Sequence, residues 1–443
     1  MVFPIVGGDG KPTGYEIDNS LRFWNGDYLK DTTFGAGTNR KKFTFSYWIK
    51  PTNLDTGGNP SLVYSNDSND HIGFDGDNKF IFADSGSIIL KTNRVFRDVS
   101  AWYHIVLAVD TTQSTAGNRY KLYVNGTQET SLATDAGISQ NTDLNFHNNE
   151  VHSIGRNQYD GTDFLYAYLA EFHAIDGQQL DPTYFGETND NGVWIPKEYT
   201  GTYGNNGIFM EFKQSGTGQS SSSMGADTSG NDNHFTTIAV DATNQTTDTP
   251  TNNFCTWNPL QINVSDPPTA FEEGNTVVNE TSNADWSSTA GTQSISNGKW
   301  YWEVKYVGSG SLMIGAIRQD YASTTFAKSS NAFAGKDSGD YGFNYRENGI
   351  FYFNGSTDTG NTTFGNNDIV MIALDMDNQA IYTGKNGTWN DSGDPTSGSS
   401  KTGASYTGIQ NEFYSPTVSM SSSDVDAQAN FGNASYSISS GNA

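Results

Sequence analysis

Two acidic loops carry the side chains with the clearest chemical potential in this sequence. They read Asn66-Asp-Ser-Asn-Asp70 and Asp75-Gly-Asp-Asn78. Clustered carboxylate and amide oxygens are the hard ligands that calcium prefers. The candidate calcium ligands are Asp67, Asp70, Asp75 and Asp77. The alternative is a pair of polar turns, where Asp, Asn and Gly are favoured for backbone reasons alone. No other cofactor is indicated.

Aromatic residues beside polar ones form a second candidate set. The apolar face of a pyranose ring suits the side chains of Tyr and Trp. In the first half of the chain the candidate ligand-binding residues are Asn157, Tyr159, Asp160, Asp163, Phe164 and Tyr166. In the second half they are Tyr321, Phe326 and Tyr341. The alternative is that each of these aromatic rings caps a hydrophobic core, and the sequence supports this interpretation at least as well as ligand binding.

Residues suited to catalysis are scattered. His147 and His152 lack the paired spacing of a zinc site, and no cysteine cluster supports them. His104 lies in an apolar stretch, where we expect a satisfied core histidine. The sequence has no Gly-x-Ser-x-Gly nucleophile elbow and no phosphate-binding loop. We therefore expect no catalytic residues and no enzymatic activity.

Charge excludes several partners. The 443 residues include 49 Asp and Glu against 24 Lys and Arg, a net charge of −25. Nucleic acid and anionic membranes would be repelled by this balance, and we expect neither as a partner. The N-terminal sequence lacks a secretory signal, and no stretch has the roughly 18 apolar residues that span a bilayer. We expect a protein made in a cytoplasm and kept soluble, without membrane insertion.

Short alternating runs predict strands throughout. A fold with the single cysteine Cys255 has no intrachain disulfide and depends on burial, for which 58 aromatic residues (9 Trp, 23 Tyr and 26 Phe) supply area. Clear strands are expected over residues 43–49, 102–109, 120–124, 164–175, 207–212, 300–304, 312–317, 349–353, 368–374, 380–383, 416–420 and 427–431. Asn125-Gly126, Asn354-Gly355 and Asn386-Gly387 predict tight hairpin turns. Residues 214–266 lack apolar periodicity, which favours an extended connector pinned by Phe254, Trp257 and Leu260.

Two segments resemble known families. Residues 15–212 are similar to a laminin-G-like, concanavalin-type sandwich, through Phe45-Ser-Tyr-Trp-Ile49, Trp102-Tyr-His-Ile-Val106, Lys121-Leu-Tyr-Val-Asn-Gly126 and Leu169-Ala-Glu-Phe172. Residues 296–435 resemble a SPRY domain, through Gly298-Lys-Trp-Tyr-Trp-Glu-Val304, Ile314-Gly315, Tyr341-Gly-Phe343, Asp368-Ile-Val370 and Asn386-Gly-Thr-Trp389. Both families are binding scaffolds with diverse partners.

The combination resembles tail-fibre proteins of marine bacteriophages. Two further motifs carry this resemblance, Gly14-Tyr-Glu-Ile-Asp-Asn-Ser-Leu-Arg-Phe23 and Asp248-Thr-Pro-Thr-Asn-Asn253. Concanavalin-type glucanases have a Glu-x-Asp-x-x-Glu strand whose outer glutamates perform catalysis. Here Glu16-Ile-Asp-Asn-Ser-Leu21 begins that pattern but ends in leucine, which argues against catalysis.

We expect an all-β fold of two antiparallel β-sandwiches with little or no helix. The predicted segments are residues 1–25 for contact with the virion or a neighbouring subunit, 26–212 for the laminin-G-like sandwich, 213–270 for the connector, and 271–443 for the SPRY-like sandwich. The expected function is attachment of a phage particle to a host-surface glycan or protein, by a virion protein that forms a homo-oligomer, a trimer by analogy with fibres. The alternatives are an architectural role, binding only other virion tail or capsid proteins, and a polysaccharide depolymerase.

Overall fold

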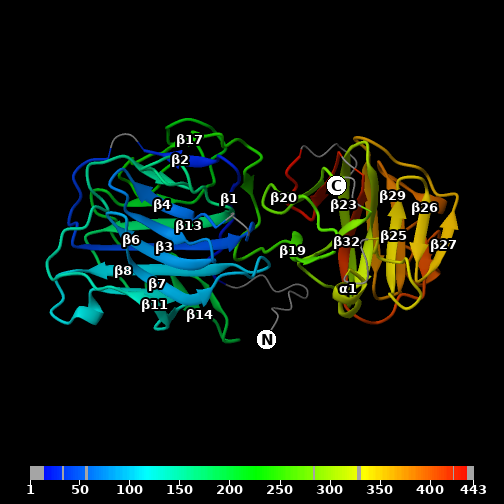
Figure 1. Ribbon diagram of the computed structural model, residues 1–443, viewed down its shortest axis with the longest axis horizontal. Coiled ribbons are helices and arrows are strands. Elements are labelled where there is room, and N and C mark those ends of the chain that lie inside the picture. Colours follow the sequence, from blue (N-terminus) through cyan, green and yellow to red (C-terminus); the bar gives the residue numbers. More distant parts are fainter. Residues whose placement is uncertain are drawn as a thin grey trace. The chain divides into compact units, whose positions relative to one another are not determined.

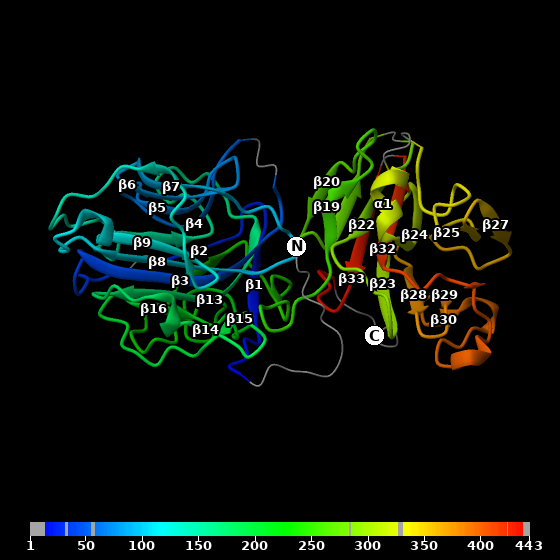
Figure 2. The same cartoon turned by 90° about the horizontal axis from the view of Figure 1, so that it is seen from below.

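The computed structural model describes residues 14–31, 34–54, 58–282, 285–326, 331–422 and 424–436. The chain divides into two compact units, Met1–Asn253 and Phe254–Ala443. Figures 1 and 2 show strands in both units and the α-helix α1 (Gln319–Phe326). No helix in the described ranges is both long enough and apolar enough to cross a bilayer.

The first unit is a sandwich of two eight-stranded antiparallel sheets. One sheet contains β1 (Ser20–Phe23), β3 (Lys42–Pro51), β8 (Tyr103–Asp110), β9 (Tyr120–Val124), β10 (Thr127–Gln128), β13 (Ala167–Asp176), β16 (Ile208–Met210) and β18 (Gln245–Thr246). The other contains β2 (Tyr28–Lys30), β4 (Ser61–Asn66), β5 (His71–Phe74), β6 (Lys79–Asp84), β7 (Ser87–Val95), β11 (Leu132–Asp135), β12 (His152–Ile154) and β17 (Thr236–Ile238). A separate hairpin pairs β14 (Gly186–Thr188) with β15 (Trp194–Pro196), and two 3-10 turns, η1 (Ala116–Asn118) and η2 (Pro182–Tyr184), complete the unit.

Aromatic rings fill the space between these two sheets. Phe45 of one sheet contacts Tyr64 of the other at a ring-centre distance of 4.8 Å, and Phe146 packs against both. All three side chains are fully buried. Because a buried aromatic side chain removes a large apolar area from water, these few contacts hold the two sheets face to face.

The second unit is a smaller sandwich. Its seven-stranded sheet contains β19 (Trp257–Ile262), β22 (Ser287–Gly291), β24 (Ser311–Arg318), β25 (Gly342–Arg346), β26 (Ile350–Phe353), β27 (Ser356–Thr359) and β32 (Tyr414–Ser421). Its eight-stranded sheet contains β20 (Ala270–Glu272), β21 (Val277–Glu280), β23 (Lys299–Gly308), β28 (Ile369–Asp375), β29 (Ala380–Lys385), β30 (Thr388–Trp389), β31 (Tyr406–Thr407) and β33 (Val425–Asn430). Two 3-10 turns, η3 (Asn390–Ser392) and η4 (Gly398–Ser400), follow β30.

The fold confirms the expected all-β class and its antiparallel sheets. The three predicted Asn-Gly turns join β9 to β10, β26 to β27 and β29 to β30. Both central residues of each turn have positive φ, for example 48° at Asn125 and 76° at Gly126. Because glycine has no Cβ, it adopts this conformation without strain.

The N-terminal segment differs from the expectation. Residues 1–13 lie outside the described residues, but residues 14–25 do not stand apart from the core. β1 pairs with β13 on one side and with β18 on the other, and both Leu21 and Phe23 are fully buried. Burial of these side chains, together with the ladder hydrogen bonds, makes β1 part of the first sandwich.

The expected connector over residues 213–270 is also divided differently. Met224, Phe235 and Val240 belong to the core of the first unit, and β17 pairs with β2. From Phe254 onward the chain belongs to the second unit, where Trp257 is buried. The segment is polar on average, but Met224, Phe235 and Trp257 are anchors that a search for periodicity does not detect. Leu260, expected to pin the connector, is exposed instead.

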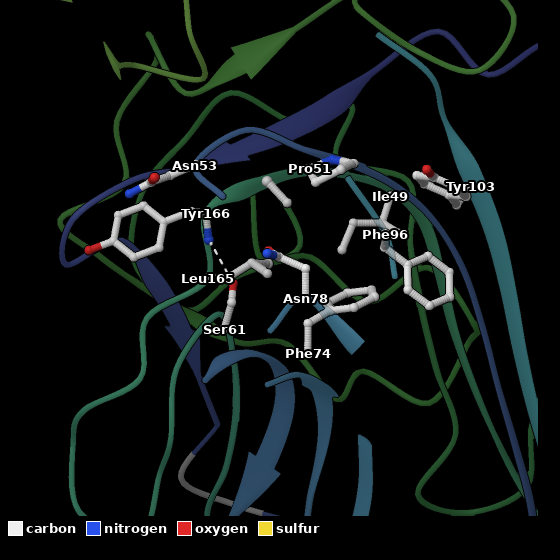
Figure 3. A pocket seen from close by; sticks show the side chains of 11 residues that line it. Ile49, Pro51, Asn53, Ser61, Phe74, Asn78, Phe96, Tyr103, Leu165 and Tyr166 are labelled. Carbon is white, nitrogen blue, oxygen red and sulfur yellow. Dashed lines mark hydrogen bonds between the residues drawn. The ribbon is translucent and has the colours of Figure 1, made fainter. Parts of the chain in front are cut away.

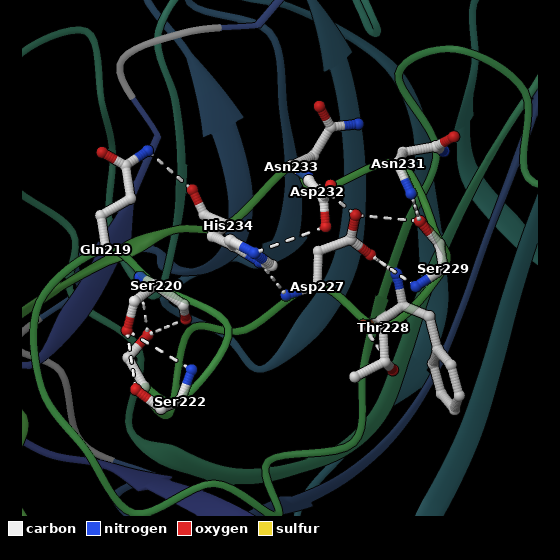
Figure 4. A network of polar contacts seen from close by, with 12 residues as sticks. Gln219, Ser220, Ser222, Asp227, Thr228, Ser229, Asn231, Asp232, Asn233 and His234 are labelled. Carbon is white, nitrogen blue, oxygen red and sulfur yellow. Dashed lines mark hydrogen bonds and ion pairs between the residues drawn. The ribbon is translucent and has the colours of Figure 1, made fainter.

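A network of polar contacts around Asp227 fixes residues 219–234 of this segment (Figure 4). The buried Asp227 carboxylate accepts hydrogen bonds from the main-chain amides of Phe209, Ser229 and Asn233, each at 2.9 Å. The His234 Nδ1 accepts one from the Asp227 amide at 3.0 Å. The loop is therefore fixed by its own side chains rather than by strand pairing.

Candidate functional site

The loop between β12 and β13, residues 155–166, contains six of the predicted ligand-binding residues. It is closed by main-chain hydrogen bonds from Asn157 to Thr162 at 2.8 Å and from Gly161 to Asn157 at 2.9 Å. The buried Asn157 side chain accepts from the Tyr159 amide at 3.1 Å and donates to Asp163 at 3.3 Å. The expected strand over residues 164–175 begins only at Ala167, so Phe164 and Tyr166 belong to the same loop as the other four residues, and the hydrogen bonds make that loop rigid.

Tyr159 and Asp160 are exposed at the tip of this loop. Tyr159 retains 61% of its surface, the largest exposed fraction among the exposed aromatic side chains of the described residues. The Asp160 carboxylate accepts from the Thr162 amide and hydroxyl, at 3.0 and 2.6 Å, which fixes its direction. An exposed ring that precedes a fixed carboxylate in the same loop tip could stack on a sugar while the carboxylate accepts a hydrogen bond from a sugar hydroxyl.

The other loop aromatics lean against a second turn. Phe164 contacts Tyr28 at a ring-centre distance of 6.4 Å, and Tyr166 meets Trp24 edge-on at 5.2 Å. The Arg156 guanidinium lies 3.8 Å from the Tyr28 ring centre, a cation–π contact. All of these aromatic rings are partly exposed. The structure therefore adds Trp24, Tyr28 and Arg156 to the predicted site.

Burial affects two groups of the loop. It raises the pKa of the Asp163 carboxyl, partly opposed by its hydrogen bond from Asn157. It also raises the pKa of the Tyr166 hydroxyl. Because Asp163 is only partly exposed and already accepts from Asn157, whereas Asp160 is exposed at the loop tip, Asp160 is the more accessible hydrogen-bond acceptor for a ligand.

Tyr166 also borders a cavity, drawn in Figure 3 with Tyr103 at its opposite side. The Tyr166 amide donates to the Ser61 hydroxyl at 3.2 Å. The cavity has a volume of about 20 Å³, enough for one or two water molecules but not for a sugar ring. Any glycan would therefore bind on the exposed side of the loop.

The predicted calcium ligands do not form one site. Asp67 accepts from Gln158 at 2.9 Å, while Asp75 accepts from the amides of its own turn, at 3.0 Å from Asp77 and 2.9 Å from Lys79, and pairs with Lys91. Within the described ranges, no group of three or more His, Cys, Asp or Glu residues is placed to hold a metal ion. The turn interpretation accounts for Asp75, whose carboxylate stabilises the backbone of its own turn, while Asp67 contacts a side chain of the loop over residues 155–166.

Asp70 differs from the other three because it is fully buried. Burial, and secondly its hydrogen bond with the Asp84 carboxyl, raises the pKa of Asp70 to about 8. A carboxyl group that holds a proton at neutral pH is not the ionised ligand that calcium requires.

In the second unit the structure gathers two of the three predicted residues. Tyr321 in α1 and Tyr341 before β25 meet at a ring-centre distance of 5.1 Å. The Arg318 guanidinium carbon lies 4.2 Å from the Tyr321 centre and 4.5 Å from the Tyr341 centre. Asp320 accepts two hydrogen bonds from Arg318, at 2.7 and 2.8 Å. This fork lowers the pKa of the Asp320 carboxyl.

Phe326 corrects the third prediction for this unit. Its side chain is fully buried with Ile317, Ala322 and Ala334, so it has no surface for a ligand. It lies at the last position of α1, where the helix packs onto the sandwich. The alternative interpretation, an aromatic that caps the core, holds for this residue.

Buried polar groups elsewhere are occupied by structural contacts. His104 is a satisfied core histidine, as expected, with Ser46 at 2.9 Å and Trp194 at 3.0 Å. Burial lowers the pKa of His104 to about 3. The buried Glu171 contacts the Tyr15 hydroxyl at 2.8 Å and His173 at 3.2 Å.

The chain was compared with known proteins. Residues 25–181 match the concanavalin A-like lectin/glucanases superfamily, and residues 299–434 match the SPRY domain. The chain consists of a laminin-G/concanavalin A-like domain followed by a SPRY domain. No curated protein matches it.

Similar solved structures include the SPRY domain of human HERC1, 17% identical with a TM-score of 0.30, covering 40% of this chain and 98% of that one. Another human SPRY domain is 14% identical with a TM-score of 0.27, covering 35% of this chain and 92% of that one. Stonustoxin is 14% identical with a TM-score of 0.30, covering 40% of this chain and 27% of its own.

Proposed function

We propose that this chain is a non-enzymatic attachment protein on the surface of a bacteriophage, of the tail-fibre or receptor-binding type. Its ligand would be a glycan or protein on the host cell surface. The observation that best supports this proposal is the rigid loop over residues 155–166, which presents Tyr159 beside Asp160. The resemblance to marine phage tail-fibre proteins supports the location on a virion tail or outer surface.

A pre-ordered loop suits a weak, repeated contact. Because its hydrogen bonds fix the backbone before binding, little conformational entropy is lost when a ligand stacks on Tyr159. Several copies on one particle, for instance in a homotrimer, would convert weak single contacts into firm adsorption. The negative net charge of −25 favours neutral or cationic surface ligands over anionic ones.

An architectural role is the second candidate. Leu260 lies in the edge strand β19, and Leu260 and Val264 are both exposed in the second unit. Exposed apolar side chains next to an open strand edge suit contact with another virion protein. In that role the chain would bind tail or capsid components and no host molecule.

The proposal is tested by incubating the purified full chain with a panel of marine bacterial cells and with polysaccharide extracted from their envelopes. Both binding and release of short sugars are measured. Saturable binding without release supports attachment. Binding with release identifies a depolymerase and overturns the non-enzymatic assignment, and failure of the intact oligomer to bind any surface favours the architectural role.

A further inference from the structure

The side chain of Lys50, at the end of β3, is fully buried in the first unit. Its Nζ lies 2.8 Å from the Asp248 Oδ2 and 2.9 Å from the Asn253 Oδ1. The ring of Tyr168, opposite Lys50 in the sheet, has its centre 5.5 Å from the same Nζ. The Lys50 amine, the Asp248 carboxyl and the Asn253 carboxamide therefore meet in a buried environment beside an aromatic ring.

The carboxyl and the carboxamide are both held in place. Asp248 is fully buried, and its Oδ1 accepts from the Trp102 indole at 3.1 Å. The Asp248 carbonyl accepts from the Ser20 hydroxyl at 2.6 Å. The Asn253 Nδ2 donates to the Ser100 carbonyl at 2.7 Å, which directs the Oδ1 of the amide toward Lys50.

We propose that Lys50 and Asn253 become joined by an intramolecular isopeptide bond, with Asp248 as the proton carrier. The carbonyl carbon of Asn253 is one bond from the oxygen that Lys50 already contacts. Because the fold holds the Lys50 Nζ in contact with the Asn253 amide, the entropy cost of an encounter is already met. The motif Asp248-Thr-Pro-Thr-Asn-Asn253 supplies both the carrier and the electrophile.

The reaction is balanced without an oxidant or a second reactant. Asp248 first takes a proton from the Lys50 ammonium, which leaves a neutral amine. The amine lone pair forms the Nζ–Cγ bond with Asn253, and the Cγ–Nδ2 bond breaks. Asp248 gives its proton to the departing nitrogen and receives the remaining Nζ proton, so the products are an amide, a protonated Asp248 and one ammonia molecule.

The buried environment of Lys50 and Asp248 favours these products. Two buried charges are expensive to keep out of water, and the reaction replaces them with a neutral amide and a neutral acid. The bond would join positions 203 residues apart in sequence. It would close most of the first unit into one covalent loop and anchor Asn253, the last residue before the second unit. A closed loop restricts the unfolded chain, as a disulfide does.

The proposal is tested by the intact mass of the purified full chain after denaturation. The expected mass is lower than the sequence mass by one ammonia molecule, and proteolysis should release a branched peptide that joins Lys50 to Asn253. Asp248→Asn and Lys50→Met should each restore the full mass. Lys42→Met, which removes a lysine paired with Asp110, should retain the loss.

A wild-type chain of full sequence mass would overturn the proposal. An ammonia loss that maps to an Asn-Gly succinimide instead of a branched peptide would overturn it equally. Because the wild-type mass alone decides, the result does not depend on whether the variants fold.

Discussion

The guanidinium of Arg318 contacts the ring of Tyr341, with its carbon 4.5 Å from the ring centre. The same guanidinium contacts Tyr321 and is held by the Asp320 carboxylate. Part of each tyrosine ring is therefore already in contact with Arg318. In the second unit a ligand would meet a cation and two ring edges rather than two free aromatic faces.

This relationship predicts a stabilising role for Arg318. Its replacement in Arg318→Ala removes two cation–π contacts and a forked ion pair, each worth roughly 0.5–1 kcal/mol near a surface. We expect the free energy of unfolding of the second unit to fall by about 1.5–3 kcal/mol in a urea titration. Arg318→Lys should recover only part of this loss, because Lys cannot form the fork. Equal stability of all three proteins would contradict this assignment.

The network of polar contacts around Asp227 predicts a second stability difference. Asp227→Ala leaves three main-chain amides without their acceptor, and a buried unsatisfied donor costs about 1–3 kcal/mol. We expect a loss of at least about 3 kcal/mol in the free energy of unfolding of the first unit. Asp232→Ala is the matched control in the same loop, since Asp232 is 88% exposed, and should change stability by less than about 0.5 kcal/mol.

The Asp70 carboxyl predicts a particular pH dependence. Its folded pKa of about 8 exceeds the unfolded value of 3.8, so the folded state binds the extra proton between these values. The stability contributed by the proton is fully present below pH 4 and is lost as the pH rises to 8. The slope is at most about 1.4 kcal/mol per pH unit. Thermal melts should show that Asp70→Asn removes this component, and parallel pH profiles for both proteins would refute it.

The same carboxyl pair predicts the response to calcium. Because burial raises the pKa of Asp70 and the four predicted ligands do not form one site, we expect the same melting curve with excess calcium and with a chelator. A melting temperature raised by calcium in the wild type, and unchanged in Asp84→Asn, would restore calcium as a ligand of this pair.

Much of the fold could be predicted from local sequence. The Asn-Gly turns and the apolar strands β3, β8 and β28 are specified by neighbouring residues, and the structure has them at the expected positions. The family resemblance of both sandwiches rests on the same strands. Periodicity did not reveal β1, whose Arg22 is buried, nor the non-periodic anchors Met224 and Phe235.

The candidate site was harder to predict because its parts are distant in sequence. Residues 155–166 were recognisable as one aromatic loop, but Trp24 and Tyr28 come from a turn more than 100 positions earlier. Trp24 lies next to Asn25-Gly26, a turn signal that could have placed its ring at a surface. Phe326 and Tyr341 could not be separated by composition, because only helix packing decides which ring is buried.

The proposed attachment function requires that the loop over residues 155–166 binds a ligand on the host surface. The most direct measurement compares saturation binding of wild type, Tyr159→Ala and Tyr184→Ala to polysaccharide extracted from bacterial envelopes. Tyr184 is the control, since it is 49% exposed in the same unit but lies in η2. We expect Tyr159→Ala to weaken binding at least about tenfold, equivalent to about 1.4 kcal/mol, and Tyr184→Ala to leave it unchanged. Equal binding by all three proteins would contradict the account.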